Sequence, residues 1–162
     1  SNVRDADTPS ETSFDPYIAF GYAIVCRIDG RNYYNAAGRH YPEEEVLSAT
    51  LDFMERSRRG LLMHTGADAG EVLFSLPLVG GVVDAFGWKA RTTGWLVGWR
   101  PFDDNTITRL TSRELIGFSV GGSAEEHDGI VSSLQIDEVS LVDLPSYEPA
   151  LVVNIDRFSN PR

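Results

Sequence analysis

The sequence predicts a mainly β fold with two or more helices, built on a closed, mostly antiparallel β-barrel of about seven strands. Two observations lead to this prediction. Short apolar segments recur along most of the chain and are separated by clusters of Gly, Pro, Asp and Ser, which is typical of strands joined by turns. Only two segments have helical spacing, so the chain lacks the strand–helix alternation of a parallel α/β sheet.

Composition limits what this fold does. The 162 residues are enough for one domain, and 42% hydrophobic with 23% charged residues is ordinary globular usage. A formal net charge of −10 argues against a nucleic-acid partner and against binding to an anionic membrane. Cys26 is the single cysteine, which excludes an intrachain disulfide, and the histidine spacing does not suit zinc. We therefore expect a soluble intracellular protein with no metal and no cofactor.

The first half of the chain contains the clearest helix. Residues 1–14 are polar and acidic and are expected to be a flexible lead-in to a single domain over 15–158. Residues 17–28 are apolar and aromatic and predict a long strand. Pro42, followed by three glutamates and an apolar face with helical spacing, begins the helix. Gly60 is placed to cap its C-terminus.

The second half predicts mostly strands. A short helix fits residues 103–113, with Asp103 or Asp104 at its N-cap. The expected strands are 61–64, 71–79, 81–86, 94–100, 115–122, 130–143 and 150–155.

Ser119 is the first candidate for chemistry. In a strand, Gly117 and Gly121 lie on the same face as Ser119, which leaves room for another backbone to approach its hydroxyl. The alternative is a tight bend in a barrel, where glycine allows close packing. The segment also fits the Gly-x-Ser-x-Gly elbow of α/β hydrolases, but that elbow requires a helix after the serine. Residues 125–129 predict a loop, so we reject the elbow.

A histidine and an acid complete a candidate set. His64 ends a short apolar run before a Gly-rich stretch, and Glu138 shares a strand face with apolar residues. A carboxylate in that position needs a partner, and an imidazolium on His64 would be one. Asp137, on the polar face, is the alternative acid. Lys89 in a Ser–Lys dyad and Asp103 in a chymotrypsin-like order are weaker alternatives.

Four motifs, in this order, resemble those of the phage prohead proteases, most closely the XkdF-like serine proteases. They are Met63 to Gly66, Thr93 to Gly98, Glu114 to Gly122 and Asp137 to Ser146. The resemblance extends over residues 17–155. It implies a fold like that of the herpesvirus assemblins. It also implies cleavage of scaffold and major capsid proteins, and of the protease itself, during prohead assembly in the cytoplasm of the bacterial host.

The resemblance also implies roles for individual residues. The catalytic histidine corresponds to His64, the nucleophile to Ser119 and the third member to Glu138, with Asp137 as its alternative. The backbone N–H of Ser146 is the candidate oxyanion donor. The herpesvirus relatives imply a homodimer. Two other functions stay open at this point: a catalytically silent barrel that binds capsid or scaffold, and a hydrolase of small esters.

Overall fold

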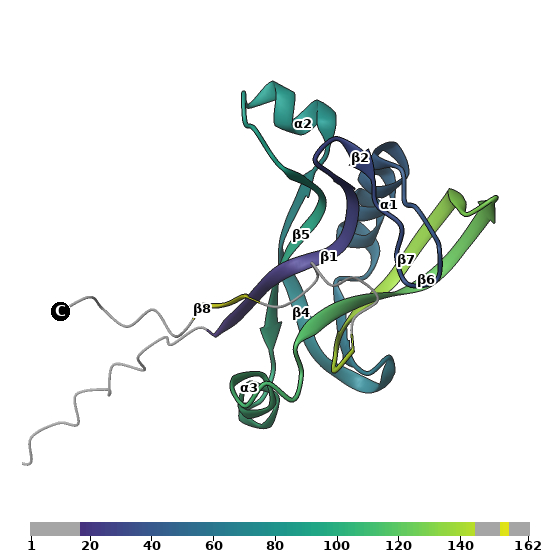
Figure 1. The fold of residues 1–162 in the computed structure, drawn as a ribbon. Helices are drawn as coiled ribbons and strands as arrows, with labels where there is room; N and C mark the ends of the chain where they lie inside the picture. Colours follow the sequence, from purple (N-terminus) through teal and green to yellow (C-terminus); the bar gives the residue numbers. More distant parts are fainter. Residues whose placement is uncertain (1–16, 145–152, 156–162) are drawn as a thin grey trace, which may run out of the picture.

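The computed structural model describes residues 17–144 and 153–155, and these ranges form one curved sheet with three helices (Figure 1). The lead-in over 1–14 and the last residues of the expected domain therefore lie outside the described part. The elements are β1 (Ile18–Ile28), β2 (Arg31–Asn32), α1 (Glu43–Arg56), β3 (Arg59–Leu62), β4 (Thr65–Leu78), α2 (Gly80–Ala85), β5 (Thr92–Pro101), α3 (Asp104–Thr111), β6 (Gly117–His127), β7 (Ile130–Val142) and β8 (Val153–Ile155). None of the three helices is long and apolar enough to cross a membrane.

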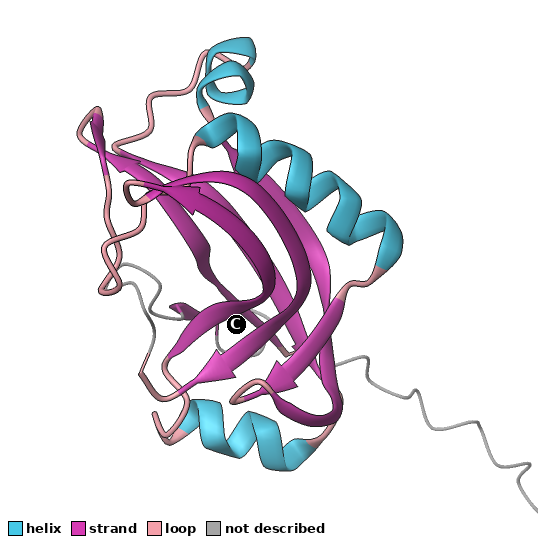
Figure 2. Cartoon of the chain, turned by 90° about the vertical axis from the view of Figure 1, so that its right-hand side faces the viewer, coloured by secondary structure: helices cyan, strands magenta, loops and turns pink. Residues whose placement is uncertain are grey.

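The sheet is an open half-barrel, so the predicted closure is wrong. Its strand order is β2-β1-β5-β4-β3-β7-β6, with β8 paired to β1, and every pairing is antiparallel except that of β3 with β7. Closure would require β6 to pair with β1. One edge of β1 pairs with β5, and the other is occupied by β8 at residues 18–20 and by β2 at residues 27–28. Figure 2 shows how strongly the sheet curves, and β6, the last strand in its order, does not pair with β1 in the described residues.

Two tryptophans of β5 connect the sheet to α1 and to β7. The Trp95 ring packs edge-on against Phe53 of α1, with centroids 5.3 Å apart, and both residues are fully buried. The Trp99 indole N–H donates to the Val139 carbonyl of β7 at 3.0 Å. Burial of rings of this size is a main source of the apolar stabilisation of a domain. β7 is thus attached to the core by both packing and a buried hydrogen bond.

Gly60 does not have the expected capping role. The helix α1 ends at Arg56 with Ser57 as its C-cap, and Gly60 lies in β3. A Cβ at Gly60 would lie 2.4 Å from the Trp99 ring. The glycine is needed because β3 crosses directly over the indole, a tertiary contact that local sequence does not reveal.

Of the two shorter helices, the sequence predicted α3 but not α2. The helix α3 is confirmed, and the Asp103 carboxylate at its N-cap accepts the Thr106 N–H at 2.8 Å. Residues 81–86, expected to be a strand, lie mostly within α2. The reason is long-range: the Glu43 carboxylate accepts the Gly80 N–H at 2.7 Å and satisfies an otherwise free donor in the first turn.

The β6–β7 hairpin is longer than expected. The loop predicted over residues 125–129 is mainly strand, because β6 continues to His127. The turn comprises Asp128 and Gly129, both with positive φ, as two-residue hairpin turns require. Ser119 is therefore followed by strand and not by helix, which agrees with rejection of the hydrolase elbow.

Candidate active site

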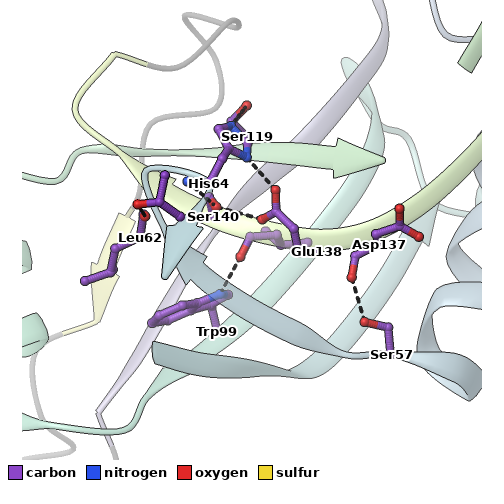
Figure 3. A network of polar contacts seen from close by, with 10 residues as sticks. Ser57, Leu62, His64, Trp99, Ser119, Asp137, Glu138 and Ser140 are labelled. Atoms are coloured by element: carbon purple, nitrogen blue, oxygen red, sulfur yellow. Dashed lines mark hydrogen bonds and ion pairs between the residues drawn. The ribbon is translucent and has the colours of Figure 1, made fainter. Parts of the chain in front are cut away.

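Ser119, His64 and Glu138 lie together in the structure, although they are far apart in the chain (Figure 3). Ser119 is on β6, Glu138 is on β7, and His64 lies in the turn between β3 and β4. They converge because β7 lies between the other two strands: Ser119 pairs with Ser140 across β6 and β7, and Leu62 pairs with Leu141 across β3 and β7.

The three side chains form one continuous hydrogen-bonded chain. His64 Nε2 is 3.0 Å from Ser119 Oγ, and His64 Nδ1 contacts Glu138 Oε1. A carboxylate accepts hydrogen bonds, so the pairing with Glu138 favours the tautomer that has its proton on Nδ1. In that tautomer Nε2 of the neutral ring is the acceptor for the Ser119 hydroxyl. The His64 side chain is 40% exposed whereas that of Glu138 is 9% exposed, so solvent reaches the hydrogen-bonded series at the end where Ser119 lies.

His64 is held in an unusual backbone conformation. Met63 and His64 are the two central residues of the turn between Leu62 and Thr65, with φ of +52° and +60°. Such turns normally contain Asn or Gly at these positions. Two non-glycine residues there cost on the order of 1–3 kcal/mol each, and strain of this kind is concentrated at functional sites. The expected strand over residues 61–64 is therefore wrong at Met63 and His64, which form the turn after β3.

Glu138 is buried with a partner for each carboxylate oxygen. Its Oε1 contacts the His64 ring, and its Oε2 accepts the Ser140 hydroxyl at 2.6 Å. Gly121 faces it across β6 and β7, and a Cβ there would lie 1.9 Å from Oε1. We expected Gly121 to make room for an approaching backbone. In the structure the absence of its side chain makes room for the carboxylate.

Ser140 was missed by the sequence reasoning. It is fully buried, and its Oγ also accepts the His64 backbone N–H at 3.0 Å. The signal that could have found it is its spacing, because residues two apart on a strand share a face. A serine two positions after a buried acid is placed to hydrogen-bond to it.

The other candidate residues lie elsewhere. Asp137 faces α1, where its carboxylate is 3.2 Å from Nη1 of Arg56 and is 47% exposed. Asp103 caps α3. Lys89 lines a cavity of about 720 Å³ beside α2, and none of the three converging residues lines it. Ser146, the candidate oxyanion donor, lies outside the described residues.

A cysteine nucleophile or a metal centre has no support in the described ranges. Burial raises the pKa of the Cys26 thiol to about 12, and the negative charges of Glu43 and Glu44 add to the shift. The thiol is thus protonated, and it lies in the core. No group of three metal-ligating side chains gathers among residues 17–144 and 153–155.

Comparison of the chain with protein-family models, with curated proteins and with solved structures finds no match. What the fold and the site define is a mainly β half-barrel in which a serine, a histidine and a glutamate form one hydrogen-bonded chain.

Proposed function

We propose that this chain is a serine endopeptidase, with Ser119 as nucleophile, His64 as general base and Glu138 as the residue that orients the imidazole. The single observation that carries the proposal is the uninterrupted contact from Ser119 Oγ through both ring nitrogens of His64 to the Glu138 carboxylate. A serine hydroxyl is a weak nucleophile without such a base, and this geometry supplies the base in the tautomer that it needs.

The reaction would take place in two stages. Ser119 Oγ attacks the peptide carbonyl carbon while its proton passes to His64 Nε2, giving a tetrahedral oxyanion. The C–N bond then breaks, Nε2 gives the proton to the leaving amine, and an acyl-enzyme ester remains. A water molecule repeats the sequence and releases the acid. Glu138 stabilises the imidazolium that forms in each stage.

The substrate class is proposed from the motifs. Their order and content resemble those of the prohead proteases, so the proposed substrates are the scaffold and major capsid proteins of a phage, and the chain itself. The proposed setting is prohead maturation in the host cytoplasm, and the active form is proposed to be a homodimer. The mainly β sheet with its three helices supports the herpesvirus-assemblin-like fold that the motifs imply only in part, because that fold implies a closed barrel and the sheet is open.

Labelling with a fluorophosphonate probe tests the nucleophile. The wild-type protein should be labelled, whereas Ser119→Ala should not. Ser123→Ala is a matched control, because Ser123 is an exposed serine on the same strand, and it should be labelled like the wild type. Equal labelling of wild type and Ser119→Ala would remove Ser119 from the mechanism.

Incubation with the cognate scaffold protein, followed by mass spectrometry of the products, tests the reaction. Internal cleavage that Ser119→Ala abolishes supports the endopeptidase. Binding of scaffold without cleavage would instead indicate the catalytically silent barrel. Turnover of nitrophenyl esters with no peptide cleavage would indicate the small-ester hydrolase.

A further inference from the structure

Ser140 makes two hydrogen bonds that both lead to the proposed catalytic histidine. Its Oγ accepts the backbone N–H of His64 at 3.0 Å and its hydroxyl donates to Glu138 Oε2 at 2.6 Å. Glu138 Oε1 in turn contacts the ring of the same histidine. These contacts therefore form a closed cycle, which runs from the His64 main chain through Ser140 and Glu138 back to the His64 side chain (Figure 3).

This cycle of contacts restrains both the backbone conformation of His64 and the position of its ring. The bond to the His64 N–H holds a residue whose φ of +60° is unfavourable for a non-glycine side chain. The bond to Glu138 Oε2 fixes the carboxylate rotamer, and with it the position of Oε1 under Nδ1. Strained conformations persist only where the surroundings impose them. Ser140, fully buried on the central strand of the site, imposes both constraints.

We propose that Ser140 is a positioning residue of this site: one hydroxyl fixes the backbone of His64 and the carboxylate of Glu138 together, so that Nε2 reaches Ser119 in the correct tautomer. The kinetic consequence rests on the proposed endopeptidase function. The effect on the His64 ring does not, because it can be measured without a substrate.

If Ser140 had only a structural role, its replacement would have a different effect. Its replacement by alanine would change stability and leave the ring of His64 where it is. If Ser140 positions the ring, Ser140→Ala removes the support of both contacts. The loss of an orienting carboxylate from such a triad costs up to about 10⁴ in kcat, so the loss of its support should cost less, about 10–10²-fold. KM should change by less than about twofold, because ground-state binding is untouched.

Three variants separate these readings. Ser140→Ala removes the hydroxyl. Ser140→Cys keeps nearly the same volume but offers only a weak donor, so it retains the packing if alanine prevents folding. Ser140→Thr keeps the hydroxyl and should restore most of the kcat. Ser133→Ala is the control, because Ser133 is an exposed serine on the same strand.

The substrate-independent readout is the low-field proton resonance of the His64 Nδ1–H, together with hydrogen exchange of its backbone amide. We expect the wild type, Ser133→Ala and Ser140→Thr to show the resonance and a protected amide. We expect Ser140→Ala and Ser140→Cys to lose the resonance and to exchange the amide at least tenfold faster.

If Ser140→Ala and Ser140→Cys keep the resonance, the protected amide and the wild-type kcat, the positioning role is refuted. If the resonance and protection are lost in both while the wild-type protein cleaves no peptide, the endopeptidase proposal fails and the positioning of His64 by Ser140 stands. If the resonance is kept but kcat falls, Ser140 acts by another route and the proposal is also overturned.

Discussion

Replacing Gly121 with alanine tests whether the position of the Glu138 carboxylate matters, without removing any functional group. The new Cβ would lie 1.9 Å from Glu138 Oε1 and 2.8 Å from its Cδ, and Cβ atoms essentially never approach a heavy atom within 3.0 Å. The carboxylate must therefore retreat by about 1 Å or more. The backbone of β7 cannot move instead, because it is paired with β6 on one side and β3 on the other.

The magnitude follows from this displacement. A shift of about 1 Å in a group that sets catalytic geometry costs about 10²-fold in rate, equivalent to about 2.7 kcal/mol in the activation barrier. We expect kcat of Gly121→Ala to fall about 10²-fold, with KM nearly unchanged. Displacement of the carboxylate also weakens its contact with His64 Nδ1, but the carboxylate is still present, so the loss should stay below the roughly 10⁴-fold that removal of an orienting carboxylate can cost.

The assay is cleavage of a peptide substrate under saturating and subsaturating conditions, with thermal unfolding measured on the same samples. Gly81→Ala is the control, because Gly81 lies in α2 with open space where its Cβ would be placed. That variant should retain full activity. Gly121→Ala with kcat within threefold of the wild type and an unchanged fold would refute the coupling of Glu138 to the reaction.

Three further predictions follow from single contacts. Glu138→Gln should slow peptide cleavage at least 10²-fold whereas Asp137→Asn should leave kcat unchanged; the reverse result would make Asp137 the third member. Cys26 should resist alkylation by iodoacetamide at about pH 8 in the folded protein and react in urea, because burial raises its pKa to about 12; rapid labelling of the native protein, measured by mass, would contradict its placement. The Thr106 N–H lowers the pKa of Asp103, so the stabilisation from this carboxylate is present above about pH 4 and is lost as the pH falls through the lowered pKa. Asp103→Asn keeps the cap acceptor and does not titrate, so its Tm should fall less than that of the wild type between about pH 5 and pH 3; equal falls would assign the acid sensitivity to other groups.

Local patterns predicted the elements that are determined locally. The long first strand was predicted from an apolar run bounded by turn residues, and α1 from its first-turn glutamates and apolar spacing. The helix α2 was missed because its start depends on Glu43, which is 37 residues away. The open edge of the sheet was missed in part for the same kind of reason, since β8 pairs with β1 from more than 130 residues away, a pairing that alternation does not encode.

The site residues likewise fall into those that local sequence predicts and those that depend on contacts between distant segments. Alternation along a strand placed Ser119 beside two glycines and Glu138 on an apolar face, and both placements are local properties. The turn at His64 was not predictable in this way, because Met63 and His64 are not turn-forming residues and adopt positive φ only where β7 holds them. The Met63 N–H donates to the Leu141 carbonyl of β7 at 3.0 Å, next to the bond between His64 and Ser140.

The open half-barrel does not weaken the proposed site, because the missing pairing is not one that the site uses. All three converging residues depend on two ladders, β6 with β7 and β3 with β7. The strand β7 is held from the core side by the Trp99 indole, which donates to the Val139 carbonyl between Glu138 and Ser140. The three strands that carry the site, β3, β7 and β6, are therefore paired in that order. The edge of the sheet that stays open lies between β6 and β1.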